Sequence, residues 1–377
     1  MVSPLAVDGA FWNGRRVLIT GHTGFKGGWL ALWLQSLGAE VSGLALAPPT
    51  VPNLFEAARI GDGMAGVLGD IRDPAAVDAS LAASRPEVVI HMAAQPLVQL
   101  SYAEPVETYA VNVMGTVHLL DAVRRTPSVR AVVIVTSDKC YENREWLWGY
   151  RETEAMGGYD PYSSSKGCAE LVTAAWRRSF FPPERYGEHG VAVASARAGN
   201  VIGGGDWAAN RLVPDAMRAF LAGEELVLRN PHAVRPWQHV LEPLSGYLCL
   251  AERLCRDGVR HADGWNFGPH GESEQTVGTV VQRLSTLWGP DARWRIDGDA
   301  RHPHEAGLLA LDSAKARNRL GWSPRWSLDQ ALAASVDWYR AWDAGADMRA
   351  VTLQHIAAYT GGNTPSTFAA TAEGTLA

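Results

Sequence analysis

The sequence predicts an α/β protein with a doubly wound parallel sheet, and three observations support this fold class. Short runs of β-branched residues alternate with longer helical segments along the first half of the chain. A glycine-rich turn follows the first of these runs, and polar residues follow the later ones. The composition is 47% hydrophobic and 20% charged, with 38 glycines. This is typical of an α/β protein whose turns contain many glycines. Such alternation indicates right-handed crossovers between parallel strands.

The first elements are local and clear. Arg16–Thr20 (RVLIT) is a compact β-branched run and predicts a strand. A glycine-rich turn follows it, and the apolar segment Trp29–Leu37 predicts a helix that ends at Gly38. Val41–Ala45 predicts the second strand. The remaining elements expected before residue 200 are, in order, a strand at Val67–Leu68, a helix at Pro74–Ala83, a strand at Val88–His91, a helix at Val106–Arg125, a strand at Ala131–Val135, a helix at Tyr162–Arg178 and a strand at Val191–Ala196.

The pattern loosens after about Asn200, where three consecutive glycines and several prolines interrupt it. Helices expected at Leu212–Leu221 and Val277–Leu287 are separated by longer connections. We therefore predict a Rossmann-like dinucleotide-binding domain over residues 12–200 and a smaller substrate-binding lobe over residues 201–350. Some segments of the lobe are expected to return to the first domain. Residues 360–377 are rich in Gly, Thr, Ser and Ala and predict a disordered tail.

The glycine-rich turn predicts a dinucleotide site. Gly21, Gly24 and Gly27 have GxxGxxG spacing between a strand and a helix, so the backbone can approach a pyrophosphate at the helix N-terminus. The alternative is a tight turn without a ligand. Small side chains after the fourth strand would let the cofactor pass. The expected cofactor contacts are Gly21, Thr23, Gly24, Phe25, Lys26 and Gly27 in the turn, Asp70 and Ile71 after the third strand, and Ala93, Ala94 and Gln95 after the fourth.

Two points about the cofactor remain open from the residues alone. Asp70 could bind an adenine amino group, or it could simply cap a helix or shape a turn. The second strand ends in Leu46-Ala47-Pro48, without the acidic residue that usually holds the ribose hydroxyls and without an arginine for a 2′-phosphate. This strand therefore does not decide between NAD and NADP.

A hydroxyl, a phenol and an amine are expected to meet near the fifth strand. Tyr162 and Lys166 lie four residues apart, so on a helix they share one face. The ammonium and a positive nicotinamide ring would both lower the pKa of Tyr162 toward working pH, which makes it a base for a substrate hydroxyl. Ser137, at the end of the fifth strand, could bind the same oxygen. The alternative is an ordinary exposed helical pair.

Asp138 and Lys139 are not needed for hydride transfer, which the hydroxyl, the tyrosine and the lysine already explain. An acid and an amine beside an oxidation site predict a second reaction. Asp138 suits a general acid if burial keeps it protonated, and Lys139 suits a base if desolvation and its cationic neighbours keep it neutral. The alternative is a plain ion pair.

These residues resemble those of a known superfamily. TGHTGFKG, HMAAQ, VNVMGT with Asn112, and the Ser137, Tyr162 and Lys166 set are similar to the extended short-chain dehydrogenases/reductases. Within that superfamily, TSDKCY, YSSSKG, ARAGNVIGGGDWAANRLVPD, RPWQHVLEP and HPHEA resemble the CDP-glucose 4,6-dehydratases over roughly residues 12–345. Related dehydratases usually carry Asp-Glu, or Glu alone, where this chain has Asp138-Lys139.

The resemblance implies an NAD-dependent reaction on CDP-glucose, with Asn112, Tyr162 and Lys166 also contacting the cofactor. Carbon 4 would be oxidised, water would leave across carbons 5 and 6, and hydride would return to carbon 6. The product would be a 4-keto-6-deoxy sugar, a precursor of surface polysaccharide. The alternatives are a dehydratase or 4-epimerase for another nucleotide sugar, and a non-catalytic NAD sensor. A 4-epimerase would not need the pair at 138–139.

The substrate contacts expected from the resemblance and from residue chemistry are Asn200, Arg211, Arg235 and Arg301. An arginine fork suits a pyrophosphate, although each arginine alone could be a solvated surface residue. His302, His304 and Glu305 lack a further ligand and predict loop structure, so no metal is expected.

The remaining expectations concern partners and location. A net charge of −6 does not favour nucleic acid or an anionic membrane. The sequence shows no signal peptide and no membrane-spanning run, so a cytoplasmic protein is expected. The helices Val106–Arg125 and Tyr162–Arg178 resemble those that pair subunits in the superfamily, which implies a homodimer or a dimer of dimers.

Overall fold

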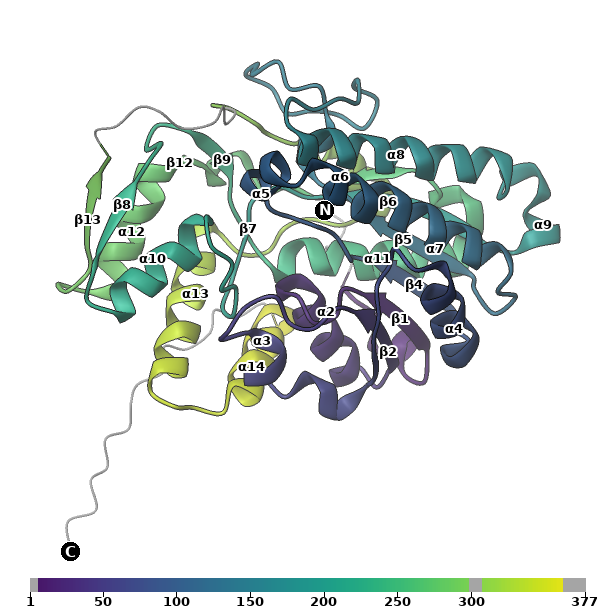
Figure 1. The fold of residues 1–377 in the computed structure, drawn as a ribbon, viewed down its shortest axis with the longest axis horizontal. Coiled ribbons are helices and arrows are strands. Elements are labelled where there is room, and N and C mark those ends of the chain that lie inside the picture. Colours follow the sequence, from purple (N-terminus) through teal and green to yellow (C-terminus); the bar gives the residue numbers. More distant parts are fainter. Residues whose placement is uncertain (1–5, 298–306, 362–377) are drawn as a thin grey trace, which may run out of the picture.

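A computed structural model describes residues 6–297 and 307–361. Its centre is a seven-stranded sheet in the order β11-β6-β5-β4-β1-β2-β3, and every neighbouring pair is parallel (Figure 1). The chain leaves β1 toward one edge of the sheet and then returns to fill the other. The predicted doubly wound fold is confirmed. The strands are β1 (Arg16–Thr20), β2 (Glu40–Ala45), β3 (Ala65–Leu68), β4 (Val88–His91), β5 (Ala131–Val135), β6 (Ala192–Arg197) and β11 (Gly264–Asn266).

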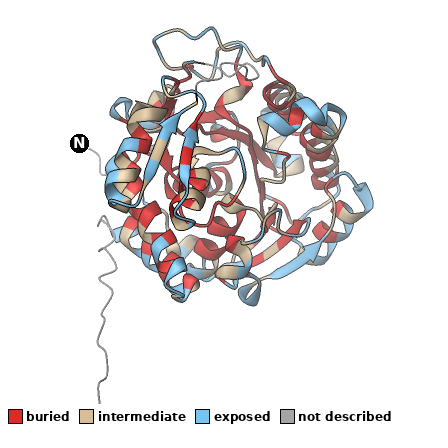
Figure 2. Ribbon diagram, turned by 60° about the vertical axis from the view of Figure 1, so that its left-hand side comes forward, coloured by how far each residue is buried: buried red, intermediate tan, exposed pale blue. Residues whose placement is uncertain are grey.

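The two faces of the sheet support separate apolar cores because successive side chains of a strand point to opposite sides. In β1, Val17 and Ile19 belong to one core and Leu18 to the other. The first core includes α2 (Phe25–Ser36), α11 (Leu241–Asp257), α13 (Leu328–Asp343) and α14 (Met348–Gly361). The second lies under α4 (Pro74–Ser84), α7 (Gly115–Arg124) and α8 (Pro161–Ser179). Figure 2 shows the buried residues concentrated in the sheet and on the inner sides of the helices.

A smaller lobe lies beside the carboxyl ends of the strands (Figure 1). It is built from α10 (Leu212–Leu221), α12 (Val277–Trp288) and two strand pairs, which are β8 (Glu225–Leu228) with β13 (Arg293–Ile296) and β9 (Val234–Pro236) with β12 (Glu274–Thr276). A third pair joins β7 (Val201–Ile202) to β10 (Gln238–His239). Between these lobe segments, α11 and β11 return to the sheet, where β11 pairs with β6. The division of the chain near residue 200 stays a prediction.

Several local details differ from the predicted elements. The single helix expected at Val106–Arg125 consists of α6 (Pro105–Tyr109), a π-helical turn at Ala110–Met114 and α7. Helix α14 extends to Gly361, and the rest of the predicted tail lies outside the described residues. None of the described helices is long and apolar enough to cross a membrane. The shorter helices are α1 (Gly9–Trp12), α3 (Leu54–Ala57), α5 (Val98–Ala103) and α9 (Tyr186–His189).

Candidate active site

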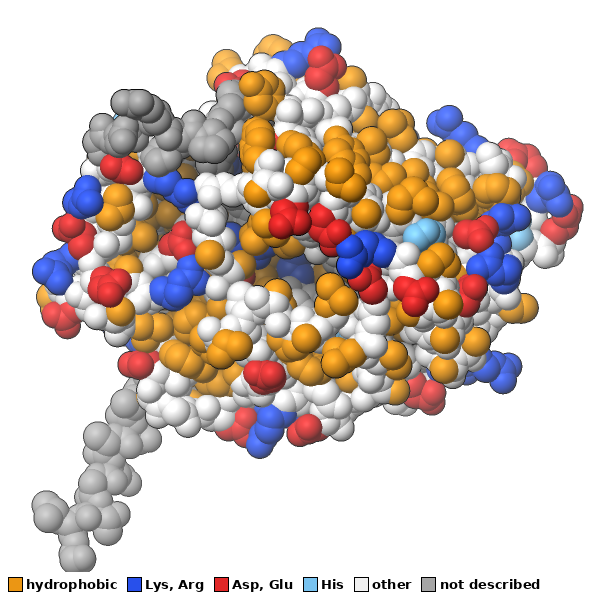
Figure 3. All heavy atoms as spheres, in the orientation of Figure 1, with side chains coloured by type: hydrophobic (Ala, Val, Ile, Leu, Met, Phe, Trp, Pro, Cys, Tyr) orange, Lys and Arg blue, Asp and Glu red, His pale blue; other side chains and the backbone are white. Residues whose placement is uncertain are grey.

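The predicted site residues converge on one edge of the sheet. Gly21 follows β1, Ala93 lies just beyond β4, Ser137 lies just beyond β5, and Asn200 lies just beyond β6. The candidate site therefore lies at the carboxyl ends of these four neighbouring parallel strands. This is where ligands bind in doubly wound sheets, at the point where the strand order reverses. Figure 3 shows the surface hollowed between the sheet domain and the lobe, with basic side chains visible at depth.

In the glycine-rich turn, neighbouring backbone atoms exclude a side chain at two positions, Gly21 and Gly27. Gly21 has φ of +80°, and a Cβ there would lie 2.8 Å from the Ala93 nitrogen. A Cβ on Gly27 would lie 2.1 Å from the Gly21 oxygen. Gly24 is different, because a Cβ there would sit 3.5 Å from its nearest neighbour, an ordinary contact. Gly24 also caps α2 without any side-chain hydrogen bond, so the first amides of α2 are available to a pyrophosphate.

Thr23, Phe25 and Lys26, the other predicted cofactor contacts in this turn, each contact another part of the protein. Thr23 Oγ1 donates to the carbonyl of Leu46, which ties the turn to the end of β2. Phe25 begins α2, and its ring would lie 3.3 Å from a Cβ on Gly203. Lys26 Nζ is 3.4 Å from the hydroxyl of Tyr247, a fully buried residue of α11. Burial lowers the pKa of Lys26 to about 7, with the nearby charges of Lys166 and Arg211 acting in the same direction.

Asp70 forms a turn, which was one of its two predicted roles. Its carboxylate accepts from the backbone nitrogen of Arg72 at 2.8 Å and from Arg72 Nε at 2.9 Å. The hydrogen bond from Arg72 holds the pKa of Asp70 below its usual range. The helix cap of α4 is Asp73 instead. Ile71 is buried, and its carbonyl contacts His118 at 3.2 Å. An adenine contact from Asp70 stays a prediction and would have to share the carboxylate with Arg72.

Asn112 fixes the segment after β4 against α8. Its amide nitrogen donates to the Gln95 carbonyl at 3.1 Å and to Ser165 Oγ at 2.9 Å, and its oxygen accepts from the Gln95 nitrogen. Asn112 lies in the π-helical turn, an irregularity often found at functional sites. Ala93 and Ala94 precede Gln95 and are partly buried. These contacts hold the β4 loop next to the helix that carries Tyr162.

Ser137 and Asp138 form a buried pair at the end of β5. Ser137 Oγ donates to Asp138 Oδ1 at 2.9 Å and accepts from the Lys139 nitrogen at 3.2 Å. Only 2% of Asp138 is exposed. Burial raises the pKa of Asp138, although the charge of Lys139 and the hydrogen bond from Ser137 oppose the rise. A raised pKa is what a carboxylic acid needs in order to donate a proton near neutral pH.

Tyr162 and Lys166 share one face at the start of α8, and both are buried. Burial raises the pKa of Tyr162 to about 12, and the Ser137 hydroxyl and the charge of Arg211 oppose this only in part. The protein alone therefore does not lower the pKa of Tyr162, because a buried phenolate loses more hydration than these neighbours replace. The predicted lowering also counted the positive nicotinamide ring, and it stays a prediction for the protein with its cofactor. Burial also lowers the pKa of Lys166 to about 8, and its Nζ lies 3.5 Å from the Val135 carbonyl.

Lys139 is only half-buried. Its predicted role as a base, which assumed an amine kept neutral by desolvation and by cationic neighbours, stays a prediction. Among the lysines at this edge of the sheet, Lys166 is the more deeply buried.

A buried ion pair supports the site from below, and sequence reasoning missed it. Arg197, the last residue of β6, lies 2.7 Å from Glu170 of α8, and both side chains are 5% exposed. Glu170 also accepts from Thr136 Oγ1 at 2.5 Å and from Ser195 Oγ at 2.6 Å. Burial alone would raise the pKa of Glu170, but Arg197 and the three hydrogen bonds outweigh it and lower that pKa. One local signal existed, since Glu170 lies one helical turn after Lys166.

The predicted substrate contacts occupy different surroundings. Arg211 is the N-cap residue of α10 and donates to the buried carboxylate of Asp206 at 2.8 Å. Arg235 is buried in β9, donates to the Val234 carbonyl at 2.9 Å, and its charge reaches Asp138. Asn200 is half-buried just beyond β6. Arg301, with His302, His304 and Glu305, lies outside the described residues.

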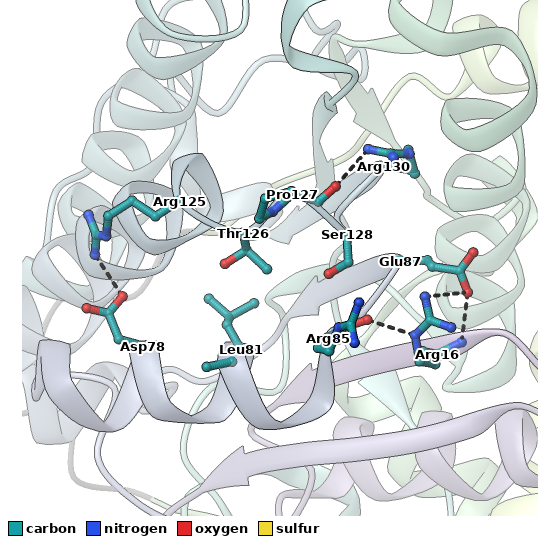
Figure 4. A pocket seen from close by; sticks show the side chains of 11 residues that line it. Arg16, Asp78, Leu81, Arg85, Glu87, Arg125, Thr126, Pro127, Ser128 and Arg130 are labelled. Carbon is teal, nitrogen blue, oxygen red and sulfur yellow. Dashed lines mark hydrogen bonds and ion pairs between the residues drawn. The ribbon is translucent and has the colours of Figure 1, made fainter.

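A separate cavity of about 730 Å³ lies at the opposite end of the sheet, near the amino ends of β1, β4 and β5 (Figure 4). Two of its four arginines already have carboxylate partners. Arg125 pairs with Asp78 at 2.7 Å, and Arg16 pairs with Glu87 at 3.6 Å. None of the predicted site residues lines this cavity.

Comparison with known proteins gives a consistent result. The family model described as GDP-mannose 4,6 dehydratase matches residues 18–334. A CDP-glucose 4,6-dehydratase of Salmonella typhimurium is 57% identical over 353 residues, which cover 94% of this chain and 98% of that protein. Two solved structures are similar in fold. A dTDP-glucose 4,6-dehydratase of Bacillus anthracis in complex with NAD has a TM-score of 0.71 at 24% identity, covering 89% of this chain and 100% of that one. A UDP-glucose 4-epimerase of Stenotrophomonas maltophila with bound NAD and formylated UDP-arabinopyranose has a TM-score of 0.75 at 22% identity, covering 88% and 100%.

Proposed function

The chain belongs to the GDP-mannose 4,6 dehydratase family, and from that premise we propose that it converts CDP-glucose to CDP-4-keto-6-deoxyglucose with NAD as its cofactor. The observation that carries the proposal is the buried carboxyl of Asp138, 2.9 Å from Ser137 Oγ and close to Tyr162. An oxidation site alone has no use for a second, buried acid whose pKa is raised. A dehydration needs one, because the hydroxyl at carbon 6 must leave as water.

The residues at the carboxyl edge of the sheet fit a dinucleotide. The N-terminus of α2 has no side-chain cap and offers its backbone amides to a ligand. The packing around Gly24 would tolerate a Cβ, so the space in front of these amides is free for a ligand. The small residues Ala93 and Ala94 follow β4. When bound, NAD supplies the redox chemistry by accepting a hydride from carbon 4 and returning it to carbon 6. Its positive ring also adds the charge that the protein alone lacks for ionising Tyr162.

We assign the oxidation to Tyr162, with Ser137 and Lys166 beside it. The phenolate of Tyr162 takes the proton of the 4-hydroxyl while Ser137 holds the same oxygen. Lys166, one helical turn after Tyr162 on the same face of α8, favours the phenolate once the positive ring of the cofactor is present. The ketone formed at carbon 4 then makes the hydrogen on carbon 5 acidic.

We assign the elimination to Asp138 and Lys139. Lys139 takes the proton from carbon 5, and Asp138 protonates the hydroxyl that leaves carbon 6. Burial supports the acid role of Asp138. Lys139 later returns a proton to carbon 5, after hydride has reached carbon 6.

The proton balance of this sequence gives Ser137 a second task. Each turnover leaves Tyr162 with one extra proton and Asp138 with one too few. The hydroxyl of Ser137 donates to Asp138 and contacts Tyr162. Accepting a proton from Tyr162 while donating one to Asp138 Oδ1, followed by a half-turn of the carboxyl about its Cβ–Cγ bond, would restore both groups without exchange with bulk water.

The base and phosphates of the substrate are assigned less directly. The preference for cytosine rests on the 57% identity to the Salmonella CDP-glucose 4,6-dehydratase. Asn200, Arg211 and Arg235 are proposed to face the nucleotide sugar, since all three lie near the carboxyl edge of the sheet. The charge of Arg211 reaches Tyr162 and that of Arg235 reaches Asp138. Both arginines would add positive charge around the pyrophosphate.

The test is the reaction with CDP-glucose and NAD. We expect loss of one water per sugar and a product whose enolised 4-keto group absorbs in alkali. A 4-epimerase would instead form CDP-galactose without loss of mass, and a sensor would form no product. Turnover of dTDP-, UDP- or GDP-glucose in preference to CDP-glucose would contradict the base assignment and leave the dehydration intact.

The protein is further proposed to act as a homodimer in the cytoplasm. Hydrophobic side chains gather over the face formed by α6, α7 and α8 (Figure 3). Val106 is 82% exposed and Leu171 is 61% exposed, and Tyr109 and Met114 also reach the surface there. Contiguous apolar surface of this kind marks an interaction site. A second copy of the same face is the partner proposed from the family resemblance.

A further inference from the structure

The two oxygens of Asp138 are not equivalent. Oδ1 accepts the hydrogen of Ser137 Oγ at 2.9 Å. Oδ2 is buried and has no hydrogen-bond partner among the described residues. A buried carboxyl oxygen without a partner is costly and calls for a reason. Because Oδ1 serves as the acceptor, the proton of the neutral acid belongs on Oδ2.

Gly199 is the residue packed against that free oxygen. A Cβ at this position would lie 2.5 Å from Asp138 Oδ2 and 2.9 Å from Pro236 Cγ. The backbone of Gly199 does not have the positive φ that would itself require glycine. A side chain at this position is therefore excluded only by its neighbours, and the nearest of them is the carboxyl of Asp138, followed by the ring of Pro236.

The backbone on both sides of Gly199 is anchored, so it has little freedom to move away. The nitrogen of Asp138 donates to the Ala198 carbonyl at 3.3 Å. The nitrogen of Gln238 donates to the Asn200 carbonyl at 3.1 Å. A methyl group added between these two hydrogen bonds would have to displace the Asp138 side chain rather than the main chain.

We propose that Gly199 is a positioning residue for the elimination step. It leaves the carboxyl of Asp138 in the rotamer that Ser137 holds from the other side, with Oδ2 ready to protonate the hydroxyl leaving carbon 6. This role rests on the proposed dehydration. It adds a specific consequence, which is that Gly199 matters for the loss of water and not for the oxidation that precedes it.

The test is Gly199→Ala. Tyr162, Ser137 and Lys166 stay in place, so oxidation at carbon 4 should continue. Displacement of Asp138 should slow water loss by ~10²-fold, the order expected for a catalytic group moved by about an ångström. The reduced nicotinamide and the 4-keto, 6-hydroxy sugar should therefore accumulate during turnover, and exchange of the carbon 5 hydrogen with solvent should persist. The KM for CDP-glucose should change little.

Two further variants make the result decisive. Gly187→Ala in α9 is the matched control, because no atom lies within 4 Å of a Cβ there, and it should behave as the wild type. Gly199→Ala with Pro236→Ala removes the second obstacle, so any remaining defect comes from Asp138. This double variant should still accumulate the oxidised sugar.

The role of Gly199 is wrong if Gly199→Ala loses water as fast as the wild type. It is also wrong if oxidation and water loss fall equally in both the single and the double variant, since that is the result of general packing damage. If the wild type itself does not remove water from CDP-glucose, the proposed function fails first. These outcomes are separate, because the wild-type assay does not depend on Gly199.

Discussion

Asp138 and Lys139 are consecutive in the chain but have different surroundings. Asp138 is buried beside Ser137, and its pKa is raised by burial, whereas Lys139 is only half-buried. The acid role of Asp138 therefore has physical support from the protein itself. The base role of Lys139 rests on its place next to Asp138 and on the chemistry of the elimination, which needs a base at carbon 5.

Lys139→Met tests that base role at the level of one residue. The variant should still oxidise carbon 4, because Ser137, Tyr162 and Lys166 are unchanged. Exchange of the carbon 5 hydrogen with deuterated solvent should fall by ~10²-fold or more, in the range of a lost general base. The exchange is followed by mass spectrometry of the recovered sugar. Unchanged exchange would remove Lys139 from this role and require another base.

Glu170→Gln tests the buried pair beneath the site. Removing one partner leaves Arg197 buried without its counter-charge, so we expect a loss of about 3–5 kcal/mol in the free energy of unfolding. The matched control is Glu188→Gln, since Glu188 and its partner Arg185 are both mostly exposed. Denaturant unfolding of the two variants should differ clearly. Equal stability of Glu170→Gln and the wild type would contradict the supporting role of the pair.

The pH dependence of this effect has a definite sign. The folded-state pKa of Glu170 is lowered below its unfolded value of about 4.3. Such a group stabilises the fold fully above the unfolded pKa, and the stabilisation is lost as the pH falls through the folded pKa. The difference between wild type and Glu170→Gln should therefore be largest near neutral pH and should shrink as the pH falls below about 4.

At the scale of elements, the glycines of the turn between β1 and α2 fall into two kinds. Packing within the protein requires glycine at Gly27, whereas at Gly24 only a bound ligand would require it. Gly24→Ala should fold normally, because its Cβ would meet only an ordinary contact at 3.5 Å. It should nevertheless weaken NAD binding about tenfold or more, since the methyl group occupies the approach to the α2 amides. Titration calorimetry with NAD and thermal unfolding measure the two effects separately.

Gly27→Ala is the counterpart of that variant. A Cβ 2.1 Å from the Gly21 oxygen cannot be accommodated, so this variant should lose folding stability as well as NAD binding. If Gly24→Ala bound NAD as well as the wild type, the proposed path of the pyrophosphate over Gly24 would be wrong.

The elements also show how far the sequence alone could lead. The strands from β1 to β6 and the glycine-rich turn were predictable because their signals are local runs of residues. Strand β11 was missed because Gly264–Asn266 is short and contains glycine and asparagine, which have weak strand propensity. Helix α11 was missed because Pro243 and Gly246 interrupt its apolar pattern.

The part of the candidate site that lies in local sequence motifs was predictable, and the part formed by long-range contacts was not. Ser137, Tyr162 and Lys166 lie in short motifs, so their meeting follows once the fold is known. The Glu170 pair with Arg197 and the contact of Gly199 with Asp138 join segments far apart in the chain. Neither has a local signature, and only the packed structure brings them together.

At the scale of the whole molecule, the apolar face of α6, α7 and α8 makes a prediction about assembly. Leu171→Asp places a charge within the proposed contact and should convert the protein to a monomer, as measured by analytical ultracentrifugation. Leu287→Asp is the control, because Leu287 is 39% exposed on α12 in the lobe, away from this face. A monomeric wild type, or a Leu171→Asp variant that stays dimeric, would contradict the proposed interface.

The most direct test of the function uses CDP-glucose carrying deuterium at carbon 4. If oxidation, elimination and hydride return occur in one active site, the deuterium should appear at carbon 6 of CDP-4-keto-6-deoxyglucose, without net consumption of NAD. Mass spectrometry and proton NMR of the product locate the label. Deuterium retained at carbon 4 of CDP-galactose, or lost from the product altogether, would contradict the assignment of this chain as a CDP-glucose 4,6-dehydratase.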